Sequence, residues 1–236
     1  MSEKEVIVKK DHEAISTYTA FLIEDLIKKI KNTKKDKINI AFSGGSTPIL
    51  MFEKLAKLTT LDWKDINIFL VDERYVNNSH QDSNYNMIKK HLLKNIEIPF
   101  QNIHHMNYQN NIEQSLKDYK DQLQKCFNFK NNEIPIFDII HLGIGRDGHT
   151  ASIFAPEQID NSQLLSITHG ESFKRITFTF KIINKAKNII FLSTGQRKQN
   201  IVKEVINKNQ KYPASLVNNQ GNIFYLLDEE AAKKLS

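Results

Sequence analysis

The sequence predicts an α/β protein with a mostly parallel central sheet, and two observations carry this prediction. Short runs of almost continuous Ile, Leu and Phe, such as Ile38–Phe42 and Ile66–Val71, have the length and composition of strands buried on both faces. Longer amphipathic segments, such as Asn111–Phe127, alternate with these runs. Strands that are each followed by a helix are typical of an α/β fold, in which ligands bind beyond the carboxyl ends of the strands.

The individual elements follow from periodicity and from cap residues. Apolar residues at helical spacing, from Ile15 to Ile30, predict the first helix, and the cap candidates Asp82 and Ser83 open the third. The expected strands are Glu5–Val8, Ile38–Phe42, Ile66–Val71, Phe137–Leu142, Ile176–Phe180, Ile189–Ser193 and Ile223–Leu227. The expected helices are Glu13–Lys31, Pro48–Lys57, Asp82–Leu93, Asn111–Phe127, Gln196–Asn207 and a terminal helix from Asp228.

Length and composition indicate a folded, soluble chain. Its 236 residues contain no repeat or linker that would divide them, so we expect one domain over residues 1–236. Hydrophobic residues make up 40% and charged residues 25%, which argues against disorder. No apolar run approaches the roughly 18 residues of a membrane helix, and the N-terminus lacks the apolar core of a signal peptide. Because Cys126 is the one cysteine, an internal disulfide and a thiolate metal site are excluded, and we expect a cytoplasmic protein.

The net charge of +6 does not indicate a nucleic-acid-binding protein. The lysines are spread among Glu and Asn on predicted helix surfaces, with no RNA-binding signature beside them. Such a surface is compatible with an anionic small substrate. Arginine occurs at positions 74, 146, 175 and 197, in or beside the motifs described below, and its planar guanidinium matches phosphate and carboxylate groups.

The first motif follows the strand Ile38–Phe42 and leads into a helix. Its two glycines allow a close approach of backbone N–H groups, a Ser or Thr hydroxyl caps the helix, and Pro48 suits the first turn. This arrangement predicts an anion site, and phosphate is the common ligand of such sites. A tight, well-capped turn is the alternative, and the Walker spacing is absent. The candidate residues are Ser43, Gly44, Gly45, Ser46 and Thr47.

The second motif, Asp72-Glu73-Arg74, follows the strand Ile66–Val71. Because consecutive residues of an extended chain alternate faces, Asp72 and Arg74 can point into a cleft while Glu73 points elsewhere. A surface ion pair is the alternative interpretation. Ser83 and Asn84, further along the chain, could supply neutral hydrogen bonds.

The third motif runs from Gly143 to Ser152 and contains Asp147-Gly148-His149. It includes a GxGxxG pattern, but Pro156 leaves no room for the long first helix of a dinucleotide-binding unit. An imidazole titrates near neutral pH and can take a proton from water, and a neighbouring carboxylate can orient it. His149 is therefore a candidate base and Asp147 its orienting group, with a structural histidine as the alternative. His104 and His105 point opposite ways in a strand, so no metal site is expected there.

Together and in this order, the segments SGGSTP, VDERYV and GIGRDGHTASIF resemble the 6-phosphogluconolactonases. The resemblance continues through RITFT at 175–179, INKA at 183–186, LSTGQRK at 192–198 and PA at 213–214, so it covers nearly the whole chain. It implies a Rossmann-like three-layer sandwich and hydrolysis of 6-phospho-D-glucono-1,5-lactone in the pentose phosphate pathway, without a cofactor or metal. We also expect a monomer or weak homodimer that binds no membrane or nucleic acid.

The resemblance also implies roles for individual residues. His149 would activate water and Asp147 would hold its ring. The phosphate would lie among the 43–48 loop, Arg175 and Lys198, with Arg74 and Asp72 beside the substrate. The tetrahedral oxyanion needs hydrogen-bond donors, and the glycine backbone amides of the loops are our candidates for them.

Two other functions stay open at this point. The related glucosamine-6-phosphate deaminases have similar loops, but a catalytic glutamate follows their Asp-Gly-His motif and a Tyr tends to occupy the position of Arg74. This chain has Phe154-Ala155-Pro156 in that segment, which favours the lactonase. A non-catalytic sugar-phosphate sensor would keep the phosphate anchors but would have no use for an Asp–His pair.

Overall fold

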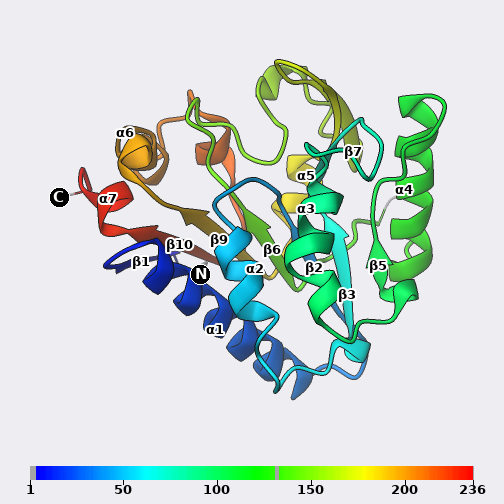
Figure 1. The fold of residues 1–236 in the computed structure, drawn as a ribbon. Helices are drawn as coiled ribbons and strands as arrows, with labels where there is room; N and C mark the ends of the chain where they lie inside the picture. Colours follow the sequence, from blue (N-terminus) through cyan, green and yellow to red (C-terminus); the bar gives the residue numbers. More distant parts are fainter. Residues whose placement is uncertain (1–3, 131–132, 236) are drawn as a thin grey trace.

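The computed structural model describes residues 4–130 and 133–235, and its main feature is a sheet of seven parallel strands (Figure 1). In spatial order the strands are β1 (Lys4–Lys9), β10 (Asn222–Asp228), β9 (Asn188–Ser193), β6 (Ile139–Leu142), β2 (Ile38–Phe42), β3 (Ile66–Leu70) and β5 (Ile103–His104). The predicted α/β fold with a mostly parallel sheet is confirmed. The first three residues, part of the segment considered for a signal peptide, lie outside the described residues.

Helices cover both faces of this sheet, which makes the three-layer sandwich. On one face lie α1 (His12–Lys31), α2 (Ile49–Leu55) and α3 (Asn84–His91). On the other lie α4 (Ile112–Phe127), α5 (Phe180–Ile183), α6 (Gln199–Ile206) and α7 (Glu229–Ala232). Both faces of the sheet are covered because successive side chains of a strand point to opposite faces and both faces are apolar. In β2, Ile40 packs into the core beneath α1, α2 and α3, and Ala41 packs into the core on the other face.

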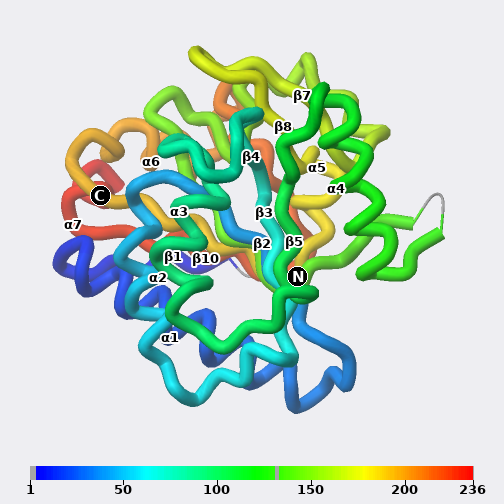
Figure 2. Tube along the Cα trace, turned by 45° about the vertical axis from the view of Figure 1, so that its right-hand side comes forward, coloured from blue at the N-terminus to red at the C-terminus, as the bar shows by residue number. Residues whose placement is uncertain are grey.

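A second, antiparallel sheet lies at the carboxyl end of β3 (Figure 2). It consists of β4 (Asp72–Arg74), β8 (Lys174–Phe178) and β7 (Leu165–His169). Its strand β4 follows β3 after one residue, and the N–H of Phe178 donates to the carbonyl of Val71 at 2.9 Å. The small sheet thereby fixes the second motif against residues that are distant in sequence.

Several predicted boundaries differ from the structure. The expected strand Ile176–Phe180 is displaced to Lys174–Phe178, because Thr179 is the N-cap of the short helix α5. The expected helix Asp82–Leu93 begins after Ser83, whose hydroxyl accepts from the N–H of Asn86. The helix expected from Gln196 opens as a 3₁₀ turn before α6. The short strands β4, β5 and β7 were not expected. β4 pairs with β8, which is about a hundred positions further along the chain, whereas β7 forms an antiparallel hairpin with β8.

A buried carboxylate joins the amino ends of the central strands. Asp138, whose side chain has no exposed surface, accepts from Lys34 Nζ at 2.6 Å, Lys187 Nζ at 2.9 Å and the N–H of Asn39 at 2.9 Å. We expect Asp138→Ala to lower the free energy of unfolding by roughly 1–2 kcal/mol, because the buried N–H of Asn39 loses its acceptor. The exposed pair of Asp25 and Lys29 provides the control, and Asp25→Ala is expected to cost less than about 0.5 kcal/mol. Equal losses in urea titrations of the two variants would contradict this.

None of the described helices has both the length and the apolar character needed to cross a membrane.

Candidate active site

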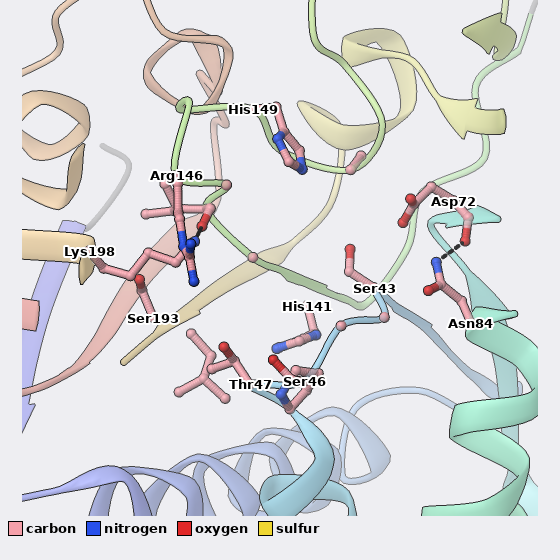
Figure 3. A pocket seen from close by; sticks show the side chains of 18 of the residues that line it. Ser43, Ser46, Thr47, Asp72, Asn84, His141, Arg146, His149, Ser193 and Lys198 are labelled. Atoms are coloured by element: carbon pink, nitrogen blue, oxygen red, sulfur yellow. Dashed lines mark hydrogen bonds between the residues drawn. The ribbon is translucent and has the colours of Figure 1, made fainter. Parts of the chain in front are cut away.

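A cavity of about 310 Å³ lies at the carboxyl edge of the central sheet, and all three motifs line it (Figure 3). This volume is at the lower end of the range of about 300–1,000 Å³ that is typical of small-molecule sites. The sequence-predicted residues in its wall are Ser43, Gly44, Gly45, Ser46, Thr47, Asp72, Arg74, His149, Arg175 and Lys198. Asp147 contacts His149. Three segments far apart in the sequence therefore meet where the topology of a parallel sheet predicts.

The first motif leaves its polar groups available to a ligand. Pro48 caps α2 without a side-chain hydrogen bond, so the expectation that Ser46 or Thr47 caps this helix is wrong. Within the described residues, no group accepts from the backbone N–H of any residue from Gly44 to Thr47. His12 donates through Nε2 to the carbonyl of Thr47 at 2.9 Å and tethers the loop from α1. Free amides and hydroxyls on a tethered loop can bind an anion.

Position 44 requires a glycine because the side chain of Asn84 approaches its backbone closely. A Cβ atom at this position would lie 1.9 Å from Oδ1 of Asn84, which would displace the asparagine or the loop. Asn84 itself donates through Nδ2 to the carbonyl of Asp72 at 2.9 Å. The first and second motifs are thus packed against each other through the first residue of α3.

The second motif divides its side chains as expected. Asp72 and Arg74 line the cavity, whereas Glu73 is buried and binds the start of α3. The carboxylate of Glu73 accepts from Ser83 Oγ at 2.9 Å and from the N–H groups of Asn84 and Tyr85, both at 2.8 Å. Burial raises the pKa of Glu73 to about 7, and these donors oppose the shift. Arg74 donates through Nη1 to the carbonyl of Asp82 at 2.7 Å, which fixes its guanidinium at the cavity.

The third motif forms the expected Asp–His pair. Nδ1 of His149 lies 2.5 Å from Oδ1 of Asp147, and the imidazole packs against the ring of Phe154 with centroids 4.6 Å apart. Burial raises the pKa of Asp147, but the neighbouring His149 outweighs this and the pKa is lowered overall. An ionised Asp147 accepts from Nδ1–H, which leaves Nε2 of His149 as a proton acceptor.

Gly145 makes this pair possible. A Cβ atom there would lie 2.1 Å from Nδ1 of His149 and 2.4 Å from Oδ1 of Asp147. The glycine that suggested a dinucleotide-binding pattern therefore makes room for the Asp–His contact. After Gly148 the chain forms no long helix, as Pro156 predicted.

Cationic side chains lie on two sides of the cavity. Lys198 and Arg146 occupy one side, and Asp72 lies on the opposite side in Figure 3. Arg175 lies with Asp72, since its Nη1 is 4.0 Å from Asp72 Oδ2. The sequence grouped Arg175 with Lys198 as anchors of one phosphate, but the two residues lie on different sides.

The basic groups also influence one another. Burial and the nearby Arg146 lower the pKa of Lys198, whose ammonium group donates to the carbonyl of Ile144. Burial and Arg74 lower the pKa of Arg175, and Asp72 opposes that shift. Each side of the cavity therefore presents two cations at close range, which is an arrangement suited to anionic groups.

Sequence reasoning missed several residues of the wall. Arg146 was noticed only as an arginine, and Ser193, the last residue of β9, received no role. His141 of β6 lines the cavity although only 1% of its surface is exposed, and neither ring nitrogen has a partner among the described residues. It lies beside Phe42 and Phe52, and burial lowers its pKa to about 3. The sequence feature that could have indicated His141 is a histidine within an otherwise apolar strand.

The histidine pair outside the cavity has a packing role. His104 stacks on Phe69 and His105 on Tyr85, with centroids 4.2 Å and 3.9 Å apart. The two rings therefore point to opposite sides, as expected. In the described part of the chain, no three His, Cys, Asp or Glu side chains are grouped closely enough to hold a metal ion.

The fold and the cavity together define an α/β protein with a cation-lined pocket and a paired imidazole. A family model described as glucosamine-6-phosphate isomerases/6-phosphogluconolactonase matches residues 10–225. The chain belongs to this family.

Several similar proteins are 6-phosphogluconolactonases. The 6-phosphogluconolactonase of Synechocystis is 38% identical over 202 residues, which cover 83% of this chain and 84% of that protein. The 6-phosphogluconolactonase of Haemophilus influenzae is 37% identical over 211 residues, which cover 84% and 88%. The crystal structure of the Thermotoga maritima 6-phosphogluconolactonase has a TM-score of 0.86 at 29% identity, covering 96% of this chain and all of that one.

A structure of a monomeric glucosamine-6-phosphate deaminase also superposes, with a TM-score of 0.82 at 21% identity, covering 98% of this chain and 99% of that one. At this identity the likeness shows the shared fold alone. The choice between the two activities therefore depends on side chains in the cavity.

Proposed function

We propose that this chain hydrolyses 6-phospho-D-glucono-1,5-lactone to 6-phospho-D-gluconate, the second step of the oxidative pentose phosphate pathway. One observation carries the proposal: a single Asp–His pair faces a cavity that has cations on two sides. Lactone hydrolysis needs one activated water, one base and donors for an oxyanion, and these groups supply them. The relatives named above, which are 6-phosphogluconolactonases, support the same reaction.

The two cationic sides suggest how the substrate is oriented. We assign the phosphate to Lys198, Arg146 and the free amides and hydroxyls at Ser46 and Thr47. The sugar ring then extends toward Asp72, which accepts from hydroxyl groups. Arg74 and Arg175, beside Asp72, remain for the ring and for the negative charge that develops at its carbonyl.

His149 is the proposed base. Asp147 accepts from Nδ1–H, so Nε2 takes a proton from water as the water oxygen attacks C1. Glycine amides of the first motif and the two arginines stabilise the tetrahedral oxyanion. When the intermediate collapses, the bond from C1 to the ring oxygen breaks, and the protonated His149 returns its proton to that oxygen.

The same groups would not suffice for deamination of glucosamine 6-phosphate. That reaction requires ring opening, enolisation and expulsion of ammonia, so several acid–base groups must act in sequence. Ala155 occupies the segment in which deaminases have a catalytic glutamate. The next carboxylate along the chain, Glu157, is exposed and lies outside the cavity wall. An ester carbonyl is already electrophilic, so the proposed hydrolysis needs no cofactor.

The proposal extends to the setting of the enzyme. We propose one domain over residues 1–236 that acts in the cytoplasm, because Cys126 forms no disulfide and suits a reducing compartment. All the proposed groups come from one chain, so a monomer or weak homodimer suffices.

The test is a direct comparison of two substrates. We expect lactone freshly generated from glucose 6-phosphate to disappear well above its spontaneous rate, measured by proton release. We expect glucosamine 6-phosphate to yield no ammonia above background and to act as a weak competitive inhibitor, because it carries the same phosphate. Ammonia release at a rate comparable with lactone turnover would favour the deaminase, and binding without turnover of either compound would favour the sensor.

A further inference from the structure

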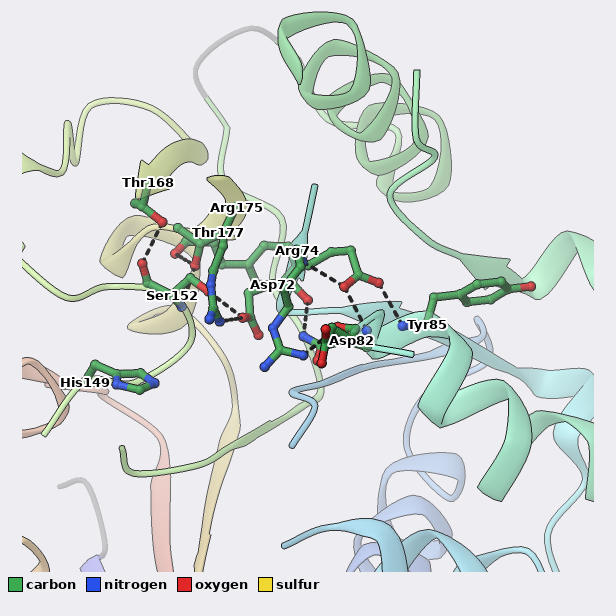
Figure 4. Close-up of polar contacts among 12 residues, drawn as sticks. Asp72, Arg74, Asp82, Tyr85, His149, Ser152, Thr168, Arg175 and Thr177 are labelled. Atoms are coloured by element: carbon green, nitrogen blue, oxygen red, sulfur yellow. Dashed lines mark hydrogen bonds and ion pairs between the residues drawn. The ribbon is translucent and has the colours of Figure 1, made fainter. Parts of the chain in front are cut away.

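Ser152 is a buried serine that connects the third motif to the second. Its hydroxyl donates to Oδ2 of Asp72 at 2.5 Å, and both side chains are almost fully buried (Figure 4). Arg175 approaches the same hydroxyl through Nη1 at 3.4 Å. Ser152 is three residues after His149, so one short segment carries the proposed base and also contacts the opposite wall of the cavity.

The backbone of Ser152 is held from both sides. Its N–H donates to Oγ1 of Thr177 at 3.1 Å, and its carbonyl accepts from Oγ1 of Thr168 at 2.8 Å. Thr177 pairs with Asp72 across β4 and β8. The preceding residue, Ala151, has a φ of 52°, a left-handed conformation that a non-glycine residue adopts only at a cost. The small sheet therefore determines where the Ser152 hydroxyl points.

This contact leaves Asp72 with one oxygen for the cavity. Ser152 occupies Oδ2, and no described residue donates to Oδ1, while Asp72 lines the cavity wall. A carboxylate held in this way accepts hydrogen bonds, so its partner is a group with an O–H to donate. A phosphate or the lactone carbonyl offers no such donor, whereas a sugar hydroxyl does.

We infer that Ser152 is a positioning residue, which by holding Oδ2 of Asp72 directs Oδ1 toward a ring hydroxyl of the lactone. The inference rests on the proposed function. Asp72 lies across the cavity from Lys198, so the hydroxyl belongs to C2 or C3, the hydroxyl-bearing ring carbons farthest from the phosphate (Figure 3). Ser152 thereby contributes to recognition of the sugar without touching it.

The experiment compares Ser152→Ala with a matched serine control in the small sheet. Ser166→Ala, in β7, removes a hydroxyl that contacts the carbonyl of Ile167 and lies outside the cavity wall. For the parent lactone we expect Ser152→Ala to lower kcat/KM about tenfold, the order of one hydrogen bond to a charged group. We expect a change below about twofold for the 2-deoxy or the 3-deoxy lactone, whichever lacks the bound hydroxyl. Ser166→Ala is expected to affect all three lactones equally.

A second variant keeps the test independent of folding. Asp72→Asn removes the acceptor charge, and the double variant with Ser152→Ala is expected to be no worse than Asp72→Asn alone, because the two residues act as a unit. Equal losses on all three lactones, or additive losses in the double variant, would overturn the inference. If the wild-type chain hydrolyses the parent lactone no faster than water does, the proposed function fails instead.

Discussion

Replacement of His149 by alanine is expected to reduce kcat for the lactone by about 10²–10⁴-fold, the usual contribution of a positioned base. The reason lies in the geometry of the pair, since Asp147 holds Nδ1 at 2.5 Å and leaves Nε2 as the acceptor in the cavity. Alanine offers no acceptor, so water would attack C1 without losing its proton to the protein. Lactone consumption corrected for spontaneous hydrolysis measures the effect.

Binding should separate this loss from misfolding. We expect the His149→Ala variant to bind 6-phosphogluconate with nearly unchanged affinity in calorimetry, because the phosphate contacts on the Lys198 side remain. His169 is an exposed histidine of β7, and His169→Ala serves as the matched control with unchanged kcat. A His149→Ala variant with near wild-type kcat would remove this residue from the mechanism.

Replacement of Lys198 by alanine is expected to raise KM by about 10–150-fold, equivalent to about 1.5–3 kcal/mol for one lost hydrogen bond between charged groups. The phosphate is remote from C1 and its charge does not change during hydrolysis, so kcat should change much less. Steady-state kinetics on the phosphorylated lactone give both parameters.

Two comparisons make the Lys198 result specific. Lys203, an exposed lysine of the adjoining helix α6, should tolerate alanine without a change in KM. With unphosphorylated gluconolactone, Lys198→Ala should behave like the wild type. Efficient wild-type hydrolysis of the unphosphorylated lactone would show that the phosphate assignment is wrong. Arg175→Ala should differ from Lys198→Ala and lower kcat, because Arg175 lies on the Asp72 side of the cavity.

The sequence was sufficient for the fold class and for the three motifs, because both depend on local patterns. Continuous apolar composition predicts buried strands such as Ile66–Leu70, and helical periodicity predicts the helix over Ile112–Phe127. The alternation of Asp72, Glu73 and Arg74 followed from extended geometry alone. The contact between Asp147 and His149 could likewise be predicted, because the two residues are only two positions apart in the sequence.

Features that depend on distant pairing could not be predicted in this way. The strand Asp72–Arg74 is three polar residues long and exists because β8 pairs with it from a distance of about a hundred positions along the chain. Arg175 was assigned to the phosphate from the resemblance, but its place opposite Lys198 is set by that pairing. The helix cap was also wrongly predicted, since Pro48 is the N-cap of α2 and the Ser46 and Thr47 hydroxyls have no partner among the described residues.

His141 gives the cavity an internal spectroscopic probe. Because burial lowers the pKa of its imidazole to about 3, the ring stays neutral throughout the range in which most proteins remain folded. Its ¹⁵N resonances therefore do not shift with ordinary changes of pH, unlike those of a solvent-exposed histidine. Its two ring nitrogens have no partner among the described residues, and the ring lines the cavity wall. A change in those resonances on adding a sugar phosphate thus reports occupancy of the cavity, separately from turnover.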